Sequence, residues 1–420
     1  MMSACRSFVL CLLSVSLSAS ILRAGDWPQI LGPNRDGIAA SDEQLNFKWP
    51  VSGPRLLWSA PLGTGFAGVA VKDNRTIAFH RIRNQEVVQC FDATTGKPLW
   101  KTEFETDYVP QVTYDNGPRC VPTIAEERVI VFGSAGGLRC LDLKTGKTQW
   151  SVETHQIYQA DEGYFGAGSS PLVVDDRVIV NVGGTRTDAG LVAFSSADGR
   201  ELWKATSEAA SYSSPIATTI GTKRVVIAMT RMNCIALDPA DGTVLFTIPF
   251  GKRGPTVNAA NPVIFDGKLF LSASYGVGAV FGQPALDGFK ELWASDDQIS
   301  SQYATSVADK DVLFGVHGRQ DSGRPALRCL DPVNQKVRWN QPLDEFATLI
   351  RADRHLLIVT VGGELIVATT SRDRFEEVAR ASVVKPTPQG SALPALSKGL
   401  LFVRDAETLN CLDLRKSDGN

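Results

Sequence analysis

The chain has 420 residues, of which 43 are Lys or Arg and 45 are Asp or Glu, so its formal net charge at pH 7 is −2. This balance excludes the basic footprint of a nucleic-acid-binding protein and the polybasic run of a membrane-surface anchor. Length alone would suggest two or three domains, but the repeats described below replace that expectation with a single closed unit.

The first 24 residues have the pattern of a secretory signal peptide. Arg6 supplies a positive charge, Ser7–Leu17 is an apolar stretch too short to span a bilayer, and Ser18–Ser20 offers small residues for cleavage. Cleavage after Ala24 is an alternative, and no cysteine stands where a lipid anchor would need one. We therefore expect an exported protein, periplasmic or secreted, without a membrane span. Residues 25–54 then form an N-terminal extension ahead of the repeats.

An eleven-residue phrase recurs along the rest of the chain at intervals of about 40–50 residues. Each copy has a short strand, a tight turn and a second strand that ends in a large aromatic residue, which is typical of a β-hairpin. The clear copies are Cys90–Trp100 and Cys140–Trp150, and the looser ones are Ala193–Trp203, Ala236–Phe246 and Cys329–Trp339. A degraded copy within Ile366–Arg380 places Val378 at the aromatic position.

A second hairpin pattern, with an apolar strand on each side of a polar turn, alternates with the first. Its eight copies are Gly68–Phe79, Val121–Phe132, Pro171–Val182, Pro215–Met229, Pro262–Ala273, Thr305–Val316, Thr348–Val359 and Ala392–Val403. The aromatic positions, from Trp58 to the degraded copy, also number eight. Because four strands make one propeller blade, both counts predict an all-β fold, an eight-bladed propeller of antiparallel strands over residues 55–420.

The two ends of this region complete each other. Asn410–Leu414 has the first half of the recurring hairpin without a second half, whereas Arg55–Trp58 has a second half without a first. Pairing Cys411–Leu414 with Leu56–Trp58 would complete the eighth blade and remove the open strand edges that invite aggregation. We therefore expect the ring to be closed by strands from both termini.

Four cysteines occupy one repeat position, where other copies carry Ala193 and Ala236. A position that accepts either Cys or Ala is a tight, buried slot for a small side chain. The four lie in different blades at equivalent positions, so we expect no disulfide among them. They are Cys90, Cys140, Cys329 and Cys411. The state of Cys120 and Cys234 stays open.

The phrase small-x-Asp-x-x-Thr-Gly-Lys-x-x-Trp resembles the tryptophan-docking motif of eight-bladed PQQ-type propellers. Cys90–Trp100 and Cys140–Trp150 match it at each defining position except that Cys replaces the usual Ala. The resemblance implies that each indole wedges between two blades and donates its N–H to a backbone carbonyl, which its size and single donor allow. The docking residues so identified are Trp58, Trp100, Trp150, Trp203, Trp293 and Trp339.

Two functional groups share that motif. One is the quinoprotein dehydrogenases, which bind PQQ and Ca²⁺ at the central channel. Resemblance to this group would imply the same cofactor site here. The other resembles the B-component of the outer-membrane β-barrel assembly machinery, a non-catalytic binder. Trp27–Gly37 is also similar to the mature N-termini of exported bacterial PQQ-like repeat proteins of unassigned function.

The sequence favours the binder. It contains neither the adjacent cysteines of the alcohol-oxidising enzymes nor a local carboxylate run with the six to eight oxygens that Ca²⁺ needs. We therefore expect no catalytic residue, no cofactor and no metal, with PQQ and Ca²⁺ as the alternative if their site is assembled from several blades. Gly63–Gly68 matches the dinucleotide-binding glycine pattern, but strands rather than a helix follow it. The expected partner is a protein or an envelope component, bound by a monomer.

Two connections between blades are unusually long, Lys101–Pro118 and Ser151–Gly168. They hold one Lys against seven carboxylates, and loops of this kind carry function on one face of a propeller. Aromatic residues amid charge are typical of a recognition surface. The alternative is that these are solvated loops that pack on each other, which would show the same sequence pattern. The candidate binding residues are Tyr108, Tyr114, Tyr158, Asp161, Glu162 and Tyr164.

The mouth of the central channel is the second candidate surface. Small polar residues precede several inner strands, as in Ser169–Pro171, Ser213–Pro215 and Ala260–Pro262. They would either bind a small ligand or simply hydrate the channel and satisfy the strand ends. The residues expected at this mouth are Arg119, Tyr212, Asn261 and Tyr303, together with Asn258 and Gln302.

Overall fold

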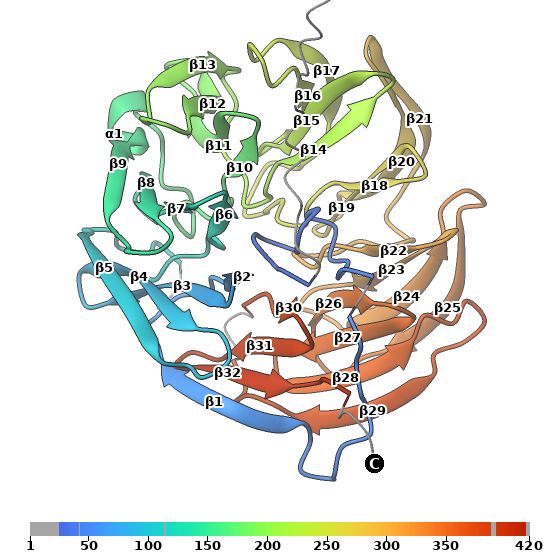
Figure 1. The fold of residues 1–420 in the computed structure, drawn as a ribbon. Helices are drawn as coiled ribbons and strands as arrows, with labels where there is room; N and C mark the ends of the chain where they lie inside the picture. Colours follow the sequence, from blue (N-terminus) through green and yellow to red (C-terminus); the bar gives the residue numbers. More distant parts are fainter. Residues whose placement is uncertain (1–24, 42, 113–114, 388–391, 417–420) are drawn as a thin grey trace, which may run out of the picture.

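The computed structural model describes residues 25–41, 43–112, 115–387 and 392–416. The predicted signal peptide, residues 1–24, lies outside the described residues. Within them, 32 strands form eight four-stranded antiparallel sheets arranged as blades around a central axis (Figure 1). This confirms the predicted eight-bladed propeller.

The blades are numbered in chain order, and their strands run from the axis outward. Blade 1 is β2 (Ala70–Lys72), β3 (Arg75–Ile82), β4 (Gln85–Asp92) and β5 (Pro98–Glu105); blade 2 is β6 (Thr123–Ala125), β7 (Arg128–Phe132), β8 (Gly137–Asp142) and β9 (Thr148–Glu153). Blade 3 is β10 (Leu172–Val174), β11 (Arg177–Gly184), β12 (Ala189–Ser195) and β13 (Glu201–Ala205); blade 4 is β14 (Ile216–Ile220), β15 (Lys223–Met229), β16 (Asn233–Leu237) and β17 (Val244–Pro249).

The second half of the ring has the same order. Blade 5 is β18 (Val263–Phe265), β19 (Lys268–Ala273), β20 (Gly278–Ala285) and β21 (Gly288–Ser295); blade 6 is β22 (Val307–Asp309), β23 (Val312–His317), β24 (Ala326–Asp331) and β25 (Lys336–Pro342). Blade 7 is β26 (Ala347–Ala352), β27 (His355–Thr360), β28 (Glu364–Thr369) and β29 (Glu377–Ser382); blade 8 is β30 (Ala395–Ser397), β31 (Leu400–Arg404), β32 (Thr408–Asp413) and β1 (Arg55–Pro61).

The strand sequences follow their place in the blade. Second strands such as β7 and β27 are apolar and almost wholly buried, because both faces of each blade pack against neighbouring blades. Outermost strands such as β5 and β25 alternate exposed with partly buried side chains, because these strands lie at the solvent edge. The core is therefore a ring of apolar layers between blades.

Both termini build blade 8, as predicted. Trp58 of β1 lies opposite Cys411 of β32, and Leu56 lies opposite Leu412. The sheet order β1-β32-β31-β30 shows that the N-terminal strand supplies the outer edge of a blade whose other strands come from the C-terminal end. The ring is thus closed by backbone hydrogen bonds.

The predicted tryptophan docking is confirmed at six blade junctions. Each indole N–H donates to a backbone carbonyl of the next blade, for example Trp58 to Ala93 at 3.0 Å and Trp150 to Ser196 at 3.0 Å. The other four donors are Trp100, Trp203, Trp293 and Trp339. Each of the first four indoles in chain order lies over a turn glycine. At Gly96 (φ 71°), an added Cβ would lie 2.6 Å from the Trp58 ring.

One predicted position is wrong by one residue. In the hairpin of blade 7, Ala379 rather than Val378 takes the place of the aromatic, because Ala379 lies opposite Val367 in the register that Trp100 has opposite Cys90. Val378 points outward and is 45% exposed. The turn of this hairpin is two residues longer, because Val367 and Ala379 are twelve positions apart whereas Cys90 and Trp100 are ten apart, and this explains the error.

The N-terminal extension fills the junction that lacks an aromatic. The Leu414 carbonyl, which is the equivalent of the Ala93 carbonyl in the repeat, accepts the backbone N–H of Asn46 at 2.7 Å. Leu45, Phe47 and Trp49 pack against the same apolar layer. A segment outside the repeats therefore replaces the missing tryptophan between blades 7 and 8.

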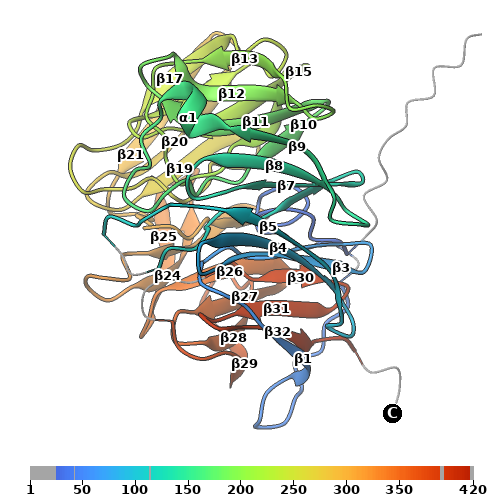
Figure 2. The ribbon, with the colours of Figure 1, turned by 90° about the vertical axis from the view of Figure 1, so that its left-hand side faces the viewer.

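The six cysteines among the described residues are buried free thiols, and four of them occupy the predicted small-residue slot. The only helix in this part of the chain, α1 (Thr154–Tyr158), lies against β8 and β11 at the periphery of the ring, which Figure 2 shows edge-on. No helix among the described residues is long and apolar enough to cross a membrane.

Candidate functional site

The central channel has two ends, which differ in structure. We call the end at which the inner strands begin the upper face, and the end at which their hairpins turn the lower face. The N-terminal segment Asp26–Ala40, here called the plug, crosses the channel from blade 1 to blade 7 (Figure 1). Trp27 exchanges two backbone hydrogen bonds with Val71, and Arg351 bonds to Gly37 and Ala39 at 2.8 Å each.

Arg35 of the plug lies on the inside of the channel and is only 2% exposed. Its guanidinium donates to the carbonyls of Pro215 (2.8 Å), Ser170 (3.2 Å) and Pro171. Its Nε donates to the Gln29 side chain at 2.7 Å. Burial lowers the pKa of Arg35 to about 9, so it remains a cation at neutral pH. The plug therefore places one positive charge, fully hydrogen-bonded, at the starts of the inner strands of blades 3 and 4.

A belt of hydrogen bonds links the blades at the same level. The backbone N–H of Val121 donates to the Ser170 hydroxyl at 2.9 Å, and that of Ser170 to the Ser214 hydroxyl at 2.8 Å. Ser214 continues the belt to Asn261 Oδ1 (2.8 Å), and the Asn261 N–H donates to the Thr305 hydroxyl at 2.9 Å. The small polar residues before the inner strands thus join one blade to the next, and Asn261 serves this belt.

The other predicted channel-mouth residues are also held by protein contacts. The Arg119 guanidinium lies between the rings of Phe66 and Phe165, 5.6 and 5.2 Å from their centroids. Tyr212 accepts the Phe165 N–H at 2.9 Å. Tyr303 lies in another sector, where its ring packs on Phe346 and its hydroxyl donates to Gln320 at 2.7 Å.

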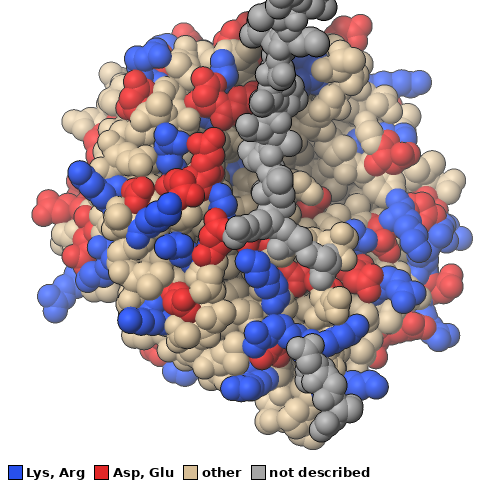
Figure 3. Space-filling view, in the orientation of Figure 1, with Lys and Arg blue, Asp and Glu red and all other residues tan. Residues whose placement is uncertain are grey.

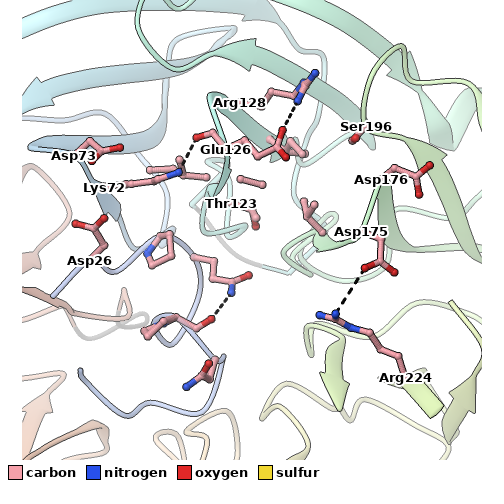
Figure 4. Close-up of a pocket in the computed structure, with 18 residues that line it drawn as sticks. Asp26, Lys72, Asp73, Thr123, Glu126, Arg128, Asp175, Asp176, Ser196 and Arg224 are labelled. Atoms are coloured by element: carbon pink, nitrogen blue, oxygen red, sulfur yellow. Dashed lines mark hydrogen bonds and ion pairs between the residues drawn. The ribbon is translucent and has the colours of Figure 1, made fainter. Parts of the chain in front are cut away.

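A recess of about 1060 Å³ remains on the lower face between the plug and blades 1 to 4 (Figure 4). Acidic side chains gather beside the axis on this face (Figure 3). Several are paired within the recess: Arg128 lies 3.0 Å from Glu126, and Arg224 lies 3.6 Å from Asp175. The sequence did not predict the recess, because part of its wall is a plug that belongs to no repeat.

The upper-face loops correct the predicted binding surface. Tyr108 is 1% exposed and Tyr158 of α1 is 5% exposed, so neither is available to a partner. Tyr158 donates to Glu201 at 2.6 Å, and the Tyr108 carbonyl accepts from Arg81 at 2.7 Å. Both rings fill the interior of loops that are too long to be held by backbone pairing alone. Tyr114 lies outside the described residues.

The remaining predicted residues surround a pocket, which we call the upper pocket. It has a volume of about 220 Å³ and lies between the loop after α1, strand β11 and the connection from blade 3 to blade 4, with Thr256 of the next connection beside it. Asp161 is exposed at its rim, and Glu162 and Tyr164 are half-buried. Its lining also includes His155, Asn181, Tyr212 and Arg231. The structure therefore brings together residues from both predicted surfaces.

Among the described residues, no group of three or more His, Cys, Asp or Glu side chains is arranged to hold a metal ion. The buried polar atoms around the axis belong instead to Ser, Thr, Asn and Arg side chains, and many of them are bonded to backbone groups.

The comparisons with known proteins give one family and two kinds of relative. Over 126 residues, 28% of this chain and 16% of that protein, the sequence is 26% identical to the quinohemoprotein alcohol dehydrogenase ADH-IIG of Pseudomonas putida. The chain thus spans about a sixth of the length of the curated relatives it matches.

Two solved structures share the fold. The match to the structure of BamB from Moraxella catarrhalis covers 87% of this chain and 99% of the BamB chain, with a TM-score of 0.61 and 15% identity. The quinohemoprotein alcohol dehydrogenase from Comamonas testosteroni covers 94% of this chain and 82% of its own, with a TM-score of 0.68 and 13% identity. At such identities the likeness concerns the fold alone.

A family profile described as outer membrane protein assembly factor BamB matches residues 51–163 and 159–341, which is more than half of the chain. The structure of this chain shows the docking tryptophans, the glycine turns and the closed ring of such a propeller. The protein belongs to the BamB-type family of PQQ-like eight-bladed propellers.

Proposed function

We propose that this chain is an exported, non-catalytic propeller that binds a protein or an envelope component through its upper face. The observation that carries the proposal is the buried Arg35 in the central channel. The resemblance to quinoprotein dehydrogenases puts PQQ and Ca²⁺ at that channel, and Arg35 with its carbonyl acceptors does not fit a bound divalent cation. Like charges repel strongly in a buried site, and the carbonyl oxygens that could bind Ca²⁺ already accept from Arg35.

The upper face has acidic groups left available for a partner. Three of the seven loop carboxylates have contacts within the chain: Glu103 pairs with Lys101 at 2.7 Å, Glu153 with Arg139 at 2.6 Å, and Asp115 accepts two backbone N–H groups. For the other four, no ion pair occurs within the described residues; they are Glu105, Asp107, Asp161 and Glu162. Such charges speed the encounter with a basic partner at low salt.

The family description supports a binder, since it names an assembly factor rather than an enzyme. The alternative is a PQQ- and Ca-dependent dehydrogenase acting on alcohols or sugars. It is favoured by the curated relatives, which include quinone-dependent alcohol dehydrogenases. Those matches cover 28–29% of this chain, so the shared segment is two or three blades of the ring.

The test is capture from an envelope extract with matched charge reversals on the two faces. The upper variant carries Asp161→Lys and Glu162→Lys, and the lower variant carries Asp175→Lys and Asp176→Lys at the β10–β11 turn. We expect the immobilised wild type and the lower variant to retain the same partner, and the upper variant to lose most of it. Equal capture by all three proteins would contradict the proposed surface, and no specific capture by the wild type would contradict the proposed function.

A further inference from the structure

The upper pocket has the size of one side chain. Pockets for drug-sized ligands and cofactors measure about 300–1,000 Å³, whereas this one measures about 220 Å³. It opens beside the loop after α1 and is walled by β11 and by the turn that follows β15. A group that enters it must therefore be narrow and must be presented by something larger outside.

Two buried polar atoms in the pocket wall have no hydrogen-bond partner among the described residues. Asn181 is 1% exposed, and its Nδ2 donates to the Met229 carbonyl at 2.7 Å, which fixes the amide and leaves Oδ1 as an unused acceptor. His155 also lines the pocket, with Nδ1 unpartnered. Burial lowers the pKa of His155 to about 4, so its ring is neutral at neutral pH and competes with no cation.

The rim of the pocket is acidic. Asp161 and Glu162 line it, and Asp107 from the other long loop lies close enough to interact with Glu162. Burial, and then the neighbouring Asp107 charge, raise the pKa of Glu162. Two carboxylates from different loops thus face each other with no Lys or Arg paired to them among the described residues.

Arg231 is the one Lys or Arg among the described lining residues. Its Nη2 donates to the Gly254 carbonyl at 2.8 Å and to the Thr256 hydroxyl at 2.9 Å, so this nitrogen already has two acceptors within the chain. The pocket as a whole offers acceptors and negative charge, and an entering group should bring donors and positive charge. A lysine ammonium has three donors and no acceptor.

We infer that the upper pocket binds a lysine or arginine side chain of the partner protein. The inference rests on the proposed function and specifies the partner's chemistry. The long side chain would pass between Asp161 and Glu162, and its terminal N–H groups would reach the unused Asn181 oxygen. The neutral His155 ring forms another part of the pocket lining.

The test uses blocked tripeptides and the histidine rings as reporters. The protein has four histidines, so ring ¹⁵N labelling gives few signals, and His80, His317 and His355 lie outside the pocket lining. We expect acetyl-Gly-Lys-Gly-amide to shift the His155 signals saturably, with a dissociation constant on the order of 1 mM. The glutamine peptide acetyl-Gly-Gln-Gly-amide, which lacks the charge, should leave them in place.

Substitutions identify the charges responsible. The double variant Asp161→Asn, Glu162→Gln should weaken binding of the lysine peptide about fivefold, whereas Glu105→Gln, an exposed carboxylate of the same face outside the pocket, should not. Equal shifts with both peptides, an unmoved His155, or full binding by the double variant would each overturn the inference.

The results distinguish a failure of this inference from a failure of the proposed function. If the wild type captures a partner that the double variant also captures fully, the basic side chain is wrong but the binding function stands. If the lysine peptide binds and no partner is captured, the pocket stands without the function.

Discussion

The plug in the channel and the loops of the upper face differ in how their polar groups are satisfied. In the plug, Arg35 donates from its guanidinium to backbone carbonyls, and the recess on the lower face pairs several of its charges. On the upper side, Asn181 Oδ1, His155 Nδ1 and the Ser213 hydroxyl are buried without partners, and four loop carboxylates lack ion pairs within the described chain. Polar groups that have hydrogen-bond partners within the chain stabilise the fold, and those without such partners are available to a ligand.

The largest expected effect concerns the blade packing that supports both the plug and the upper-face loops. Trp150→Ala removes a buried indole and its hydrogen bond to Ser196, so we expect a loss of about 3–5 kcal/mol in the free energy of unfolding. Denaturant unfolding measures it. An unchanged midpoint would show that docking does not hold the blades together.

The plug comes next. Arg35→Met keeps most of the side-chain volume but leaves the carbonyls of Ser170, Pro171 and Pro215 without their donor, so we expect a loss of about 3 kcal/mol. The control is Arg224→Met in the lower recess, whose exposed pair with Asp175 should be worth under about 1 kcal/mol. If the two variants melt alike, Arg35 is no more important than a surface charge.

The upper pocket should add a pH dependence. Burial depresses the folded pKa of His155 to about 4, below its ordinary value of 6.5, so the unfolded chain binds the proton more tightly. His155 therefore costs stability as pH falls from 6.5 to 4, by about 2–3 kcal/mol. His155→Gln should flatten that part of the stability profile. Burial also lowers the pKa of His80 to about 4, so His80 still contributes to the pH dependence of stability in the His155→Gln variant. A profile with unchanged slope would contradict a buried neutral His155.

The smallest effect belongs to the rim of the upper pocket. Asp161→Asn with Glu162→Gln should change the free energy of unfolding by less than about 0.5 kcal/mol, because no ion pair within the described residues is lost. Thermal melting checks this. A large loss would mean that the rim carboxylates support the fold, which would remove the contrast with Arg35.

The repeated parts of the molecule were predictable, and the parts outside the repeat were not. Glycine turns and aromatic positions recur at fixed spacing, so blade number, ring closure and the docking of Trp100 and Trp150 follow from local patterns. The plug has no such signal, because Arg35 acts through backbone carbonyls of distant blades. Val378 was misplaced because the hairpin of blade 7 is two residues longer than the clear copies, and Tyr108 was misread because loop tyrosines pack inward as readily as outward.

Because Arg35 of the plug occupies the channel, we expect the channel not to bind PQQ with Ca²⁺. Titration of the purified protein with PQQ in the presence of Ca²⁺, followed by quinone absorbance and by dye reduction with alcohols or sugars, tests it most directly. We expect no saturable PQQ binding and no turnover, in the wild type and in Arg35→Met alike. Stoichiometric binding with substrate-dependent dye reduction by the wild type would contradict it and favour the dehydrogenase.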